Sequence, residues 1–581
     1  MNAQTAKFVE GSTMRHILVM SGSGSVGLMA LFAVDLLDML FISMLGQIEL
    51  AAAVGFAGTL MFFSTSVSIG TSIAMGALVS KAIGAKEFDK ARQLSGSVML
   101  TAFAISLVFT VLMFAYIPEL LALIGAEGHT AERAEAYLRI IVPSGPILAV
   151  AMAAGAGLRS AGDAKRSMWV TLSGGIVNAI LDPIFIFGFN WNVEGAALAS
   201  VISRFAVLYF SLYPLIKHHN LVSLPSLSQW LTHIKAILKI AVPAIFTNTA
   251  TPIGNAIVTT SIAQYGNDFV AGYAVIGRLI PVCFAVIFAL SGAVGPIIGQ
   301  NLGAKRIDRV KETLYNSLLV TFIYTLFVCS LLFFVQDYIV QGFTLEGDAV
   351  LIVQAFCTYV AITFIFNGAI FVANTSFNNL GKPIYSTILS LGRATIGTLP
   401  FVYLGSLWFG ALGVLYGQAL GNIIFGVIAI LVLQKHIKEL MQNAAPQNEL
   451  EADIAQEAAS QEAQVTSEIA VEQAGKASKT TDSQKNNEKP DTSSPIPAPA
   501  CEQALKEEDE IPLSCLNTQP FCTLDAVLID DLASHKDELV TAPLINSDVI
   551  NNDVTNNDVT NNDVTNPDVI NNEDGKELKE K

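Results

Sequence analysis

The sequence predicts an all-α polytopic membrane protein with twelve transmembrane helices in two six-helix repeats, followed by a disordered C-terminal tail. Three observations lead to this prediction: low charge, regularly spaced apolar segments and an internal repeat. Of the 581 residues, 52% are hydrophobic and only 14% are charged, whereas soluble domains carry about 25% charged residues. Residues 441–581 hold 9 Lys and Arg against 29 Asp and Glu, which gives this tail a net charge of −20. Residues 1–440 carry a net charge of +4, so the whole chain carries −16.

Twelve segments are long and apolar enough to cross a bilayer, which requires about 20 mostly apolar residues. Several are joined by short loops, which indicates a compact bundle. The first segment is too long for a cleaved signal peptide and is expected to stay in place. The twelve segments span residues 16–45, 50–80, 93–117, 134–159, 166–190, 194–216, 236–264, 269–300, 312–335, 349–378, 384–408 and 410–434.

The loops between these segments alternate in charge. Every second loop carries Lys and Arg, as at Lys86 and Lys305, while the other loops carry mainly Asp and Glu. Basic loops of membrane proteins stay on the cytoplasmic side. The asymmetry therefore predicts an inner-membrane protein with both termini in the cytoplasm.

The chain also repeats itself at an offset of 219 residues. The segment from Gly76 to Lys86 aligns with Gly295 to Lys305, and Gly162 aligns with Gly381. Several features that match at nearly one offset argue against chance similarity between glycine-rich apolar segments. Six helices per repeat give both halves the same orientation, related by an axis along the membrane normal. The sequence thus predicts one six-helix lobe over residues 1–220 and a second over 221–440.

Residues 441–581 have a different composition, rich in Glu, Asp, Asn, Gln, Ser and Pro. Such a segment does not bury enough apolar surface to fold alone. The pentapeptide Asn-Asn-Asp-Val-Thr occurs at 551–555, 556–560 and 561–565. These features predict a disordered acidic cytoplasmic tail.

Three acidic residues lie inside predicted membrane helices, where charge is costly and usually functional. Asp35 and Asp38 are three residues apart and share one face of the first helix. Asp182 follows Asn178 by four residues on the fifth helix, which stacks the two polar groups on one face. Pro183 removes a backbone donor beside them and can bend the helix there.

Such a cluster can bind a proton, because closely spaced buried carboxylates cannot all stay ionised. It can alternatively bind Na⁺ at Asp38 and Asp182 through oxygen ligands. A structural alternative is that these acids only form hydrogen bonds between helices. In the second repeat the two positions are occupied by Ile257 and Phe401, whereas acids needed for folding would be expected in both halves. The sequence therefore predicts an ion-coupling site confined to the first repeat.

The second repeat has polar residues of its own. Asn255, Asn367 and Gln264 are candidates to line a substrate cavity, although hydrogen bonding between helices is the more frequent role of such residues. In the first helix, Gly22 and Gly24 indicate flexibility. The sequence contains no ATP-binding P-loop and no hydrolase motif. It therefore predicts no enzymatic activity and no cofactor other than a coupling ion.

Three features carry a family resemblance. Asp38 is followed by an apolar stretch and Leu45-Gly46, the loops at 84–86 and 303–305 both read Gly-Ala-Lys, and the segment from Asn178 to Gly188 is the most specific match. Together they resemble the multidrug and toxic compound extrusion (MATE) family, and in particular its DinF-like prokaryotic branch. The resemblance covers about residues 10–440.

This resemblance implies two six-helix lobes around a central cavity that opens alternately to the two sides of the membrane. It implies that Asp38, Asn178 and Asp182 are the coupling residues. It also places the hydroxyl of Ser200 at the same site. The family often has a bending proline in the first helix, which this chain lacks, so bending there would rely on Gly22 and Gly24.

The predicted function is secondary antiport: export of small cationic or amphipathic compounds, such as drugs and toxins, in exchange for H⁺ or Na⁺. The expected partners are the small-molecule substrate, the coupling cation and the lipid bilayer, with no nucleic acid. One alternative is a lipid or lipid-linked oligosaccharide flippase of the same superfamily, which would need a strongly basic cavity. Another is a membrane scaffold that recruits a cytoplasmic partner through the acidic tail.

Overall fold

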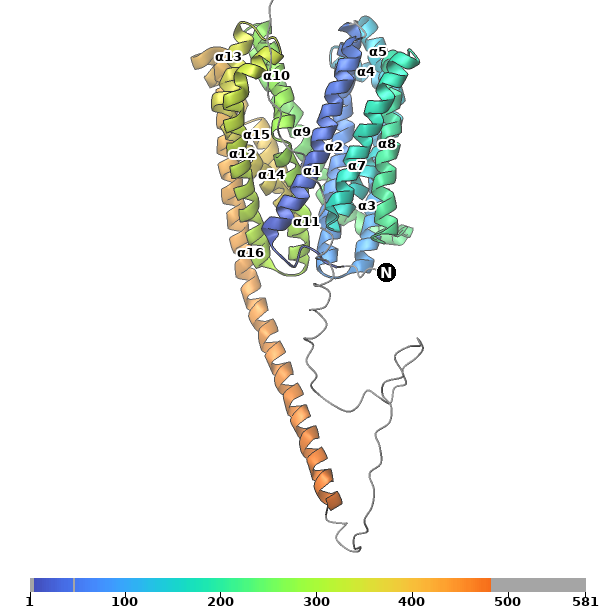
Figure 1. Cartoon of the computed structure of the whole chain (residues 1–581), viewed down its shortest axis with the longest axis vertical. Helices are drawn as coiled ribbons and strands as arrows, with labels where there is room; N and C mark the ends of the chain where they lie inside the picture. Colours follow the sequence, from blue (N-terminus) through green and yellow to red (C-terminus); the bar gives the residue numbers. More distant parts are fainter. Residues whose placement is uncertain (1–4, 45–47, 482–581) are drawn as a thin grey trace, which may run out of the picture. The chain divides into compact units, whose positions relative to one another are not determined.

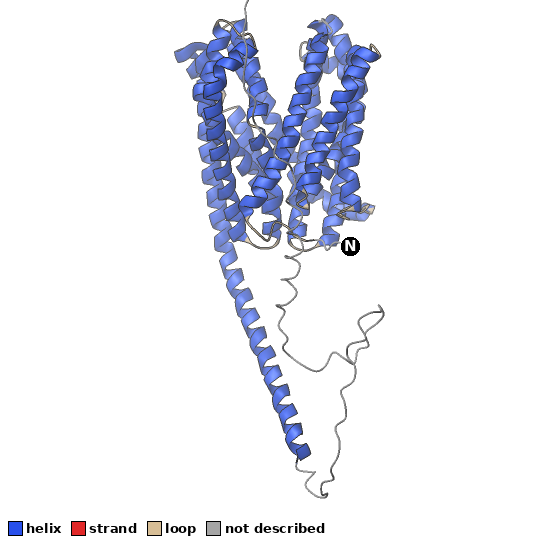
Figure 2. Cartoon of the chain, viewed as in Figure 1, coloured by secondary structure: helices blue, strands red, loops and turns tan. Residues whose placement is uncertain are grey.

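The computed structural model of the chain describes residues 5–44 and 48–481. Within these ranges all regular structure is helical, and no strand occurs (Figure 2). Contacts divide the chain into two units, Met1–Lys476 and Ala477–Lys581. The described helices belong to the first unit, apart from the last residues of the final helix.

In the first half of the chain, short elements stack end to end into membrane-length spans. A 3-10 turn or a π-helical turn changes the helix axis without ending the span. Two spans are built in this way, α5–η1–α6 and α7–η2. The elements are α1 (Thr13–Met44), α2 (Ile48–Gly84), α3 (Phe88–Ala115), α4 (Ile117–Leu123), α5 (Gly128–Ile141), η1 (Val142–Ser144), α6 (Gly145–Ser160), α7 (Ala164–Pro183), η2 (Ile184–Gly188) and α8 (Asn192–Lys217).

The second half follows the same plan. Its composite spans are α10–α11, which is interrupted at Phe284, and the stack from α13 to α14. The elements are α9 (Leu227–Ala263), α10 (Asn267–Cys283), α11 (Ala285–Gly303), α12 (Ile307–Gly342), α13 (Asp348–Ala355), η3 (Phe356–Val360), η4 (Ala361–Thr363), α14 (Phe364–Asn379), α15 (Pro383–Ala394) and α16 (Leu399–Thr481).

The prediction of twelve membrane crossings is confirmed. Length and composition identify 11 candidate spans among the described helices, and the last of them, Pro383–Asn443, has 61 residues. This span reverses at Gly410, whose φ of 60° is readily adopted by glycine. Beyond the reversal, a Cβ on Gly413 would overlap the backbone of Gly405, and a Cβ on Gly421 would overlap that of Gly397. The last candidate is therefore two antiparallel helices that touch backbone to backbone.

The internal repeat appears in the backbone as well as in the sequence. Both α6 and η1 begin 219 residues before α14 and η4, and α7 begins 219 residues before α15. Lys86 and Lys305 have φ of 61° and 59°, and Gly162 and Gly381 have φ of 77° and 78°. A positive φ at a non-glycine residue is uncommon. Its recurrence at both lysines shows that the two halves use the same turn.

The two halves form two groups of helices. Figure 1 shows α1–α8 in blue to green and α9–α16 in green to orange. The groups contact each other through α1, α2, α9 and α11, close to the face at which α1 begins, and their ribbons diverge toward the opposite face. We refer to the face at which α1 begins as the N-terminal face.

Large apolar side chains are exposed along the outside of the bundle. On α12, Phe322, Phe327 and Phe334 are 49%, 64% and 76% exposed. An apolar outer surface of this extent fits contact with lipid acyl chains rather than with water. Ala, Gly, Ser and Thr are frequent among the buried residues, and these small residues allow membrane helices to approach closely.

The structure differs from the predicted tail at its beginning. Disorder was expected from residue 441, but α16 continues to Thr481. The segment 450–475 is rich in Ala, Glu and Gln, which have high intrinsic helix propensity. A segment that is too polar to form a buried core can therefore still form a helix. The pentapeptide repeats at 551–565 lie outside the described residues.

Candidate functional site

The structure brings Asp38, Asn178 and Asp182 together. Helix α1 packs on α7, and the Asn178 amide donates to Asp38 Oδ2 at 3.0 Å and to Asp182 Oδ2 at 2.7 Å. The four-residue spacing on α7 stacks Asn178 and Asp182 on one face, as predicted. Asp182 is fully buried and Asn178 is 6% exposed. One amide nitrogen therefore bridges two carboxyl groups from different helices.

This cluster has unused oxygen atoms. Asp38 Oδ1, Asn178 Oδ1 and Asp182 Oδ1 are buried and accept no hydrogen bond. The carboxyl groups of Asp38 and Asp182 also lie close together, because both accept from the same amide nitrogen. Two carboxylates this close repel each other unless one of them is protonated. Buried polar atoms without partners are costly. The cluster thus holds three buried oxygen atoms whose hydrogen-bonding capacity is unused.

Two further residues surround the acids. Tyr137 of α5 lies near Ser200 of α8, and electrostatic interactions link it to Asp38, Asp182 and Arg204. Arg204 is 9% exposed. Its guanidinium donates to the Ser144 hydroxyl at 2.7 Å and to the Ile141 carbonyl at 3.1 Å. The site therefore draws on α1, α5, α7 and α8, all in the first half.

Sequence reasoning placed Ser200 near the acids by resemblance, but it missed Tyr137 and Arg204. Arg204 carried a usable signal, because it is a charged residue inside an apolar span. Tyr137 carried none: it lies in an ordinary amphipathic stretch, and only the packing of α5 against α8 reveals its position.

Pro183 ends α7 directly after Asp182. The chain continues as a π-helical turn, Ile184–Gly188. Proline cannot donate a backbone hydrogen bond, and π-helical turns are frequent at functional sites. The acid thus lies where the regular backbone pattern of the span is interrupted.

The other predicted residues of α1 lie apart from this hydrogen-bonded cluster. Asp35 is exposed and lies one helical turn from Asp38. Helix α1 runs without interruption through Gly22 and Gly24. A Cβ on Gly24 would lie 3.2 Å from the Ala289 Cβ on α11, whereas a Cβ on Gly22 would meet nothing within 4 Å. Gly24 is therefore a close contact between the two halves.

The polar candidates of the second half do not form one site. Asn367 is 8% exposed and accepts from the Arg393 guanidinium at 3.3 Å, which also donates to Asn422 at 3.1 Å. This network joins α14, α15 and α16. Asn255 and Gln264 are exposed side chains of α9 and its C-terminal cap. Asn367 is therefore part of a hydrogen-bond network between three helices.

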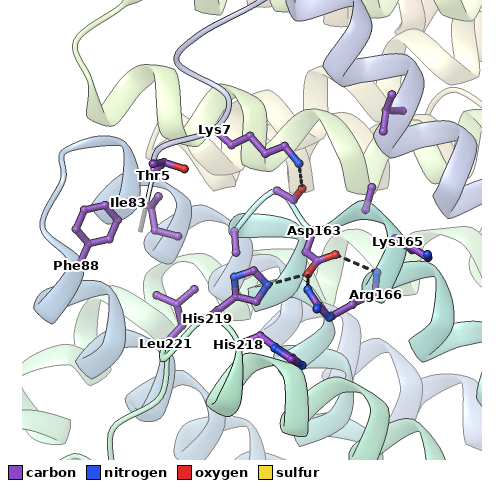
Figure 3. Close-up of a pocket in the computed structure, with 14 residues that line it drawn as sticks. Thr5, Lys7, Ile83, Phe88, Asp163, Lys165, Arg166, His218, His219 and Leu221 are labelled. Atoms are coloured by element: carbon purple, nitrogen blue, oxygen red, sulfur yellow. Dashed lines mark hydrogen bonds and ion pairs between the residues drawn. The ribbon is translucent and has the colours of Figure 1, made fainter. Parts of the chain in front are cut away.

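A second polar cluster lies on the N-terminal face, in a cavity of about 520 Å³ (Figure 3). Asp163 caps α7 by accepting from the Arg166 backbone N–H at 3.1 Å. Its Oδ2 contacts Arg166 Nη1 at 2.6 Å and His219 Nε2 at 2.8 Å. Burial raises the pKa of Asp163, but the hydrogen bonds from His219 and Arg166 outweigh it and hold that pKa well below its ordinary value.

No group of three or more His, Cys, Asp or Glu side chains within residues 5–44 and 48–481 could hold a metal ion. The carboxyl pair of Asp38 and Asp182 falls below that number. A Na⁺ ion there would depend on amide and backbone oxygens for its remaining ligands.

Comparisons with known proteins agree with this architecture. The MatE family model matches residues 25–184 and 243–404, one match in each half. The chain is 28% identical to the FAD transporter of Shewanella oneidensis, over 72% of this chain and 94% of that protein. It is 25% identical to the multidrug export protein MepA of Staphylococcus aureus, over 68% and 88%.

Solved structures show the same fold. The Vibrio cholerae MATE transporter VcmN in its bent form is 25% identical, with a TM-score of 0.69 over 74% of this chain and 98% of that one. A MOP superfamily transporter from Pyrococcus furiosus is 20% identical, with a TM-score of 0.71 over 76% and 99%. The chain belongs to the MATE family: it is a multi-pass membrane transporter, not an enzyme.

Proposed function

We propose that this transporter is an antiporter whose coupling site is the cluster of Asp38, Asn178 and Asp182, with H⁺ as the coupling ion. The observation that carries the proposal is the single amide that bridges the half-buried carboxyl group of Asp38 on α1 and the buried carboxyl group of Asp182 on α7. An ion at this position holds two helices together. Ion binding therefore has different free energies in conformations that join or separate those helices, as coupling requires.

The closeness of the Asp38 and Asp182 carboxyl groups, which share one amide donor, supports H⁺ over Na⁺. Two carboxylates at this distance repel each other unless a proton is shared. Deprotonation would leave two adjacent negative charges and favour separation of α1 from α7. Ser200 and Tyr137 would then stabilise the charged form as hydrogen-bond donors.

The proposed substrates are small cationic or amphipathic organic compounds, moved out of the cell. MepA, a multidrug export protein, supports this class, because its similarity extends over 88% of its length. A flavin nucleotide is the second candidate, since the relative from S. oneidensis is described as an FAD transporter.

For the topology, we propose that the N-terminal face is cytoplasmic in the inner membrane. The basic loops at Lys86 and Lys305 lie on this face, in agreement with the positive-inside rule. We further propose that residues 1–220 and 221–440 act as two lobes and that residues 441–581 are available to a cytoplasmic partner.

Everted membrane vesicles test the coupling site. Vesicles with wild-type protein, acidified inside by respiration, should release H⁺ when ethidium is added. Asp38→Asn and Asp182→Asn should each reduce this release at least about tenfold, the scale of a coupling free energy of 1–3 kcal/mol. Asp89→Asn is the matched control, because the Asp89 side chain is 94% exposed on the N-terminal face.

Equal H⁺ release by Asp38→Asn and Asp89→Asn would overturn the assignment of the site. Uptake of ethidium that is driven by a Na⁺ gradient and is accompanied by no release of H⁺ would replace H⁺ by Na⁺ as the coupling ion. Adding FAD to the same vesicles separates the two substrate classes, since only one of them should drive the wild-type response.

A further inference from the structure

The segment that precedes α1 crosses the N-terminal face between the two halves. In the first half, Lys7 Nζ donates to the Gly162 carbonyl at 3.0 Å, the contact drawn in Figure 3. The Phe8 ring also abuts the Gly162 turn, because a Cβ at Gly162 would lie 3.3 Å from Phe8 Cζ. The segment is therefore anchored to the α6–α7 turn.

The same segment is bound more extensively to the second half. The Phe8 N–H donates to Gln300 Oε1 at 2.8 Å. The Phe8 carbonyl accepts from Asn301 Nδ2 at 3.2 Å and from Arg309 Nη2 at 3.0 Å. Arg309 in turn donates to Asn301 Oδ1 at 3.0 Å. Three side chains from α11 and α12 thus satisfy both backbone polar groups of Phe8.

Phe8 closes the gap between these anchors. Its side chain is 1% exposed and belongs to a buried apolar cluster that contains Ala164 of the first half and Ile298 of the second. Gln300 is fully buried and its amide also donates to the Ser160 carbonyl of α6 at 2.7 Å. Through Phe8 and Gln300 the segment becomes part of the seam between the halves.

We propose that residues 6–12 form a latch that stabilises the conformation in which the two halves meet at the N-terminal face. Residues from both halves hold the latch, so separation at this face must break either the Lys7–Gly162 bond or the bonds to the Phe8 peptide. Burial of the Phe8 ring also requires both halves. The latch thus sets the balance between conformations, whatever compound is transported.

The test measures the distance between the halves at this face in the full chain, reconstituted in liposomes with the native cysteines replaced. Spin labels at Asp89→Cys and Asp308→Cys report it, since these side chains are 94% and 68% exposed and stand at equivalent positions of the two repeats. Phe8→Ala is compared with Phe8→Leu, which keeps an apolar side chain. Thr5→Ala, at an exposed residue before the latch contacts, is the control.

Phe8→Ala should shift the ratio of short to long distances at least tenfold toward long distances, equivalent to about 1.4 kcal/mol. Phe8→Leu should restore most of the short population, and Lys7→Met should give a smaller shift in the same direction. Identical distance distributions for Phe8→Ala and Thr5→Ala would overturn the latch. A lower melting temperature of Phe8→Ala without any shift in distance would also overturn it, because that result indicates a purely structural role.

Discussion

Substitution of Gly84 by alanine tests whether contact between α2 and α11 closes the N-terminal face. A Cβ on Gly84 would lie 2.6 Å from the Gln300 Cα, and nearer still to the Gln300 carbonyl, whereas ordinary contacts begin at 3.4 Å. Both obstacles are backbone atoms, so no side chain can rotate away. The helices must separate by at least about 0.8 Å at this point, and overpacking of this kind costs about 1–3 kcal/mol.

That cost applies only to the conformation in which α2 and α11 touch. A difference of 1–3 kcal/mol between two states changes their ratio about 5- to 150-fold. Gly84→Ala should therefore favour conformations in which the halves are apart at the N-terminal face. The spin-label pair at residues 89 and 308 measures this ratio directly, and ethidium efflux measures its consequence for transport.

The matched control is Gly76→Ala. Gly76 lies on the same helix, and a Cβ there would meet nothing within 4 Å. Both substitutions raise helix propensity by about 1 kcal/mol, so their difference isolates the contact with Gln300. The reasoning is refuted if the two variants give the same distance distribution and the same efflux.

Three further predictions follow from the described contacts. Because the pKa of Asp163 is lowered in the folded state, its stabilising effect is complete above the ordinary carboxyl pKa and is lost as pH falls toward the lowered value. The melting temperature of the wild type should therefore fall below about pH 4. Asp163→Asn can still cap α7, and its melting temperature should fall less over the same pH range. Parallel curves of melting temperature against pH would contradict this. Gly421→Val should prevent closure of the hairpin at Gly410 and reduce the yield of folded protein in size-exclusion chromatography, whereas Gly342→Val, where a Cβ meets nothing within 4 Å, should not. Tyr137→Phe removes the hydroxyl that contacts Ser200 and should shift the pH of half-maximal H⁺-coupled efflux, with an unchanged profile as the contrary result.

Much of the fold was predictable because each membrane crossing imposes a local requirement. About 20 apolar residues, glycine turns and basic loops can be counted along the chain. The start of the tail was not predictable in the same way. Composition showed that residues after 440 lack a core, but helix propensity alone extends α16 to Thr481.

The candidate site was predictable only within single helices. The four-residue spacing of Asn178 and Asp182 fixes their shared face, and the cost of buried charge marks Asp38. What the sequence could not supply is the rotation of one helix against another, which brings Tyr137 to Ser200 and Arg393 to Asn367. Those contacts depend on how whole helix faces pack against each other. Because many residues each contribute weakly to this packing, no single residue in the sequence indicates it.

The repeat is symmetric where the halves meet and asymmetric where the ion is proposed to bind. A Cβ on Gly84 would overlap the backbone of Gln300, and a Cβ on its repeat partner Gly303 would overlap that of Lys81, which is the repeat partner of Gln300. The seam is thus one contact made twice about the repeat axis.

The acids break this symmetry, because Asp38 and Asp182 correspond to Ile257 and Phe401 in the second half. The seam consists of two equivalent contacts. Neither half alone therefore determines whether the seam is open or closed. A single ion site in one half is sufficient to bias such a seam, provided that the ion binds its two conformations with different affinity. Introducing acids at Ile257 and Phe401 should therefore add a second protonation event per cycle, measured as more H⁺ released per ethidium in the everted vesicles. An unchanged release of H⁺ per ethidium in a variant that folds like the wild type would contradict this account.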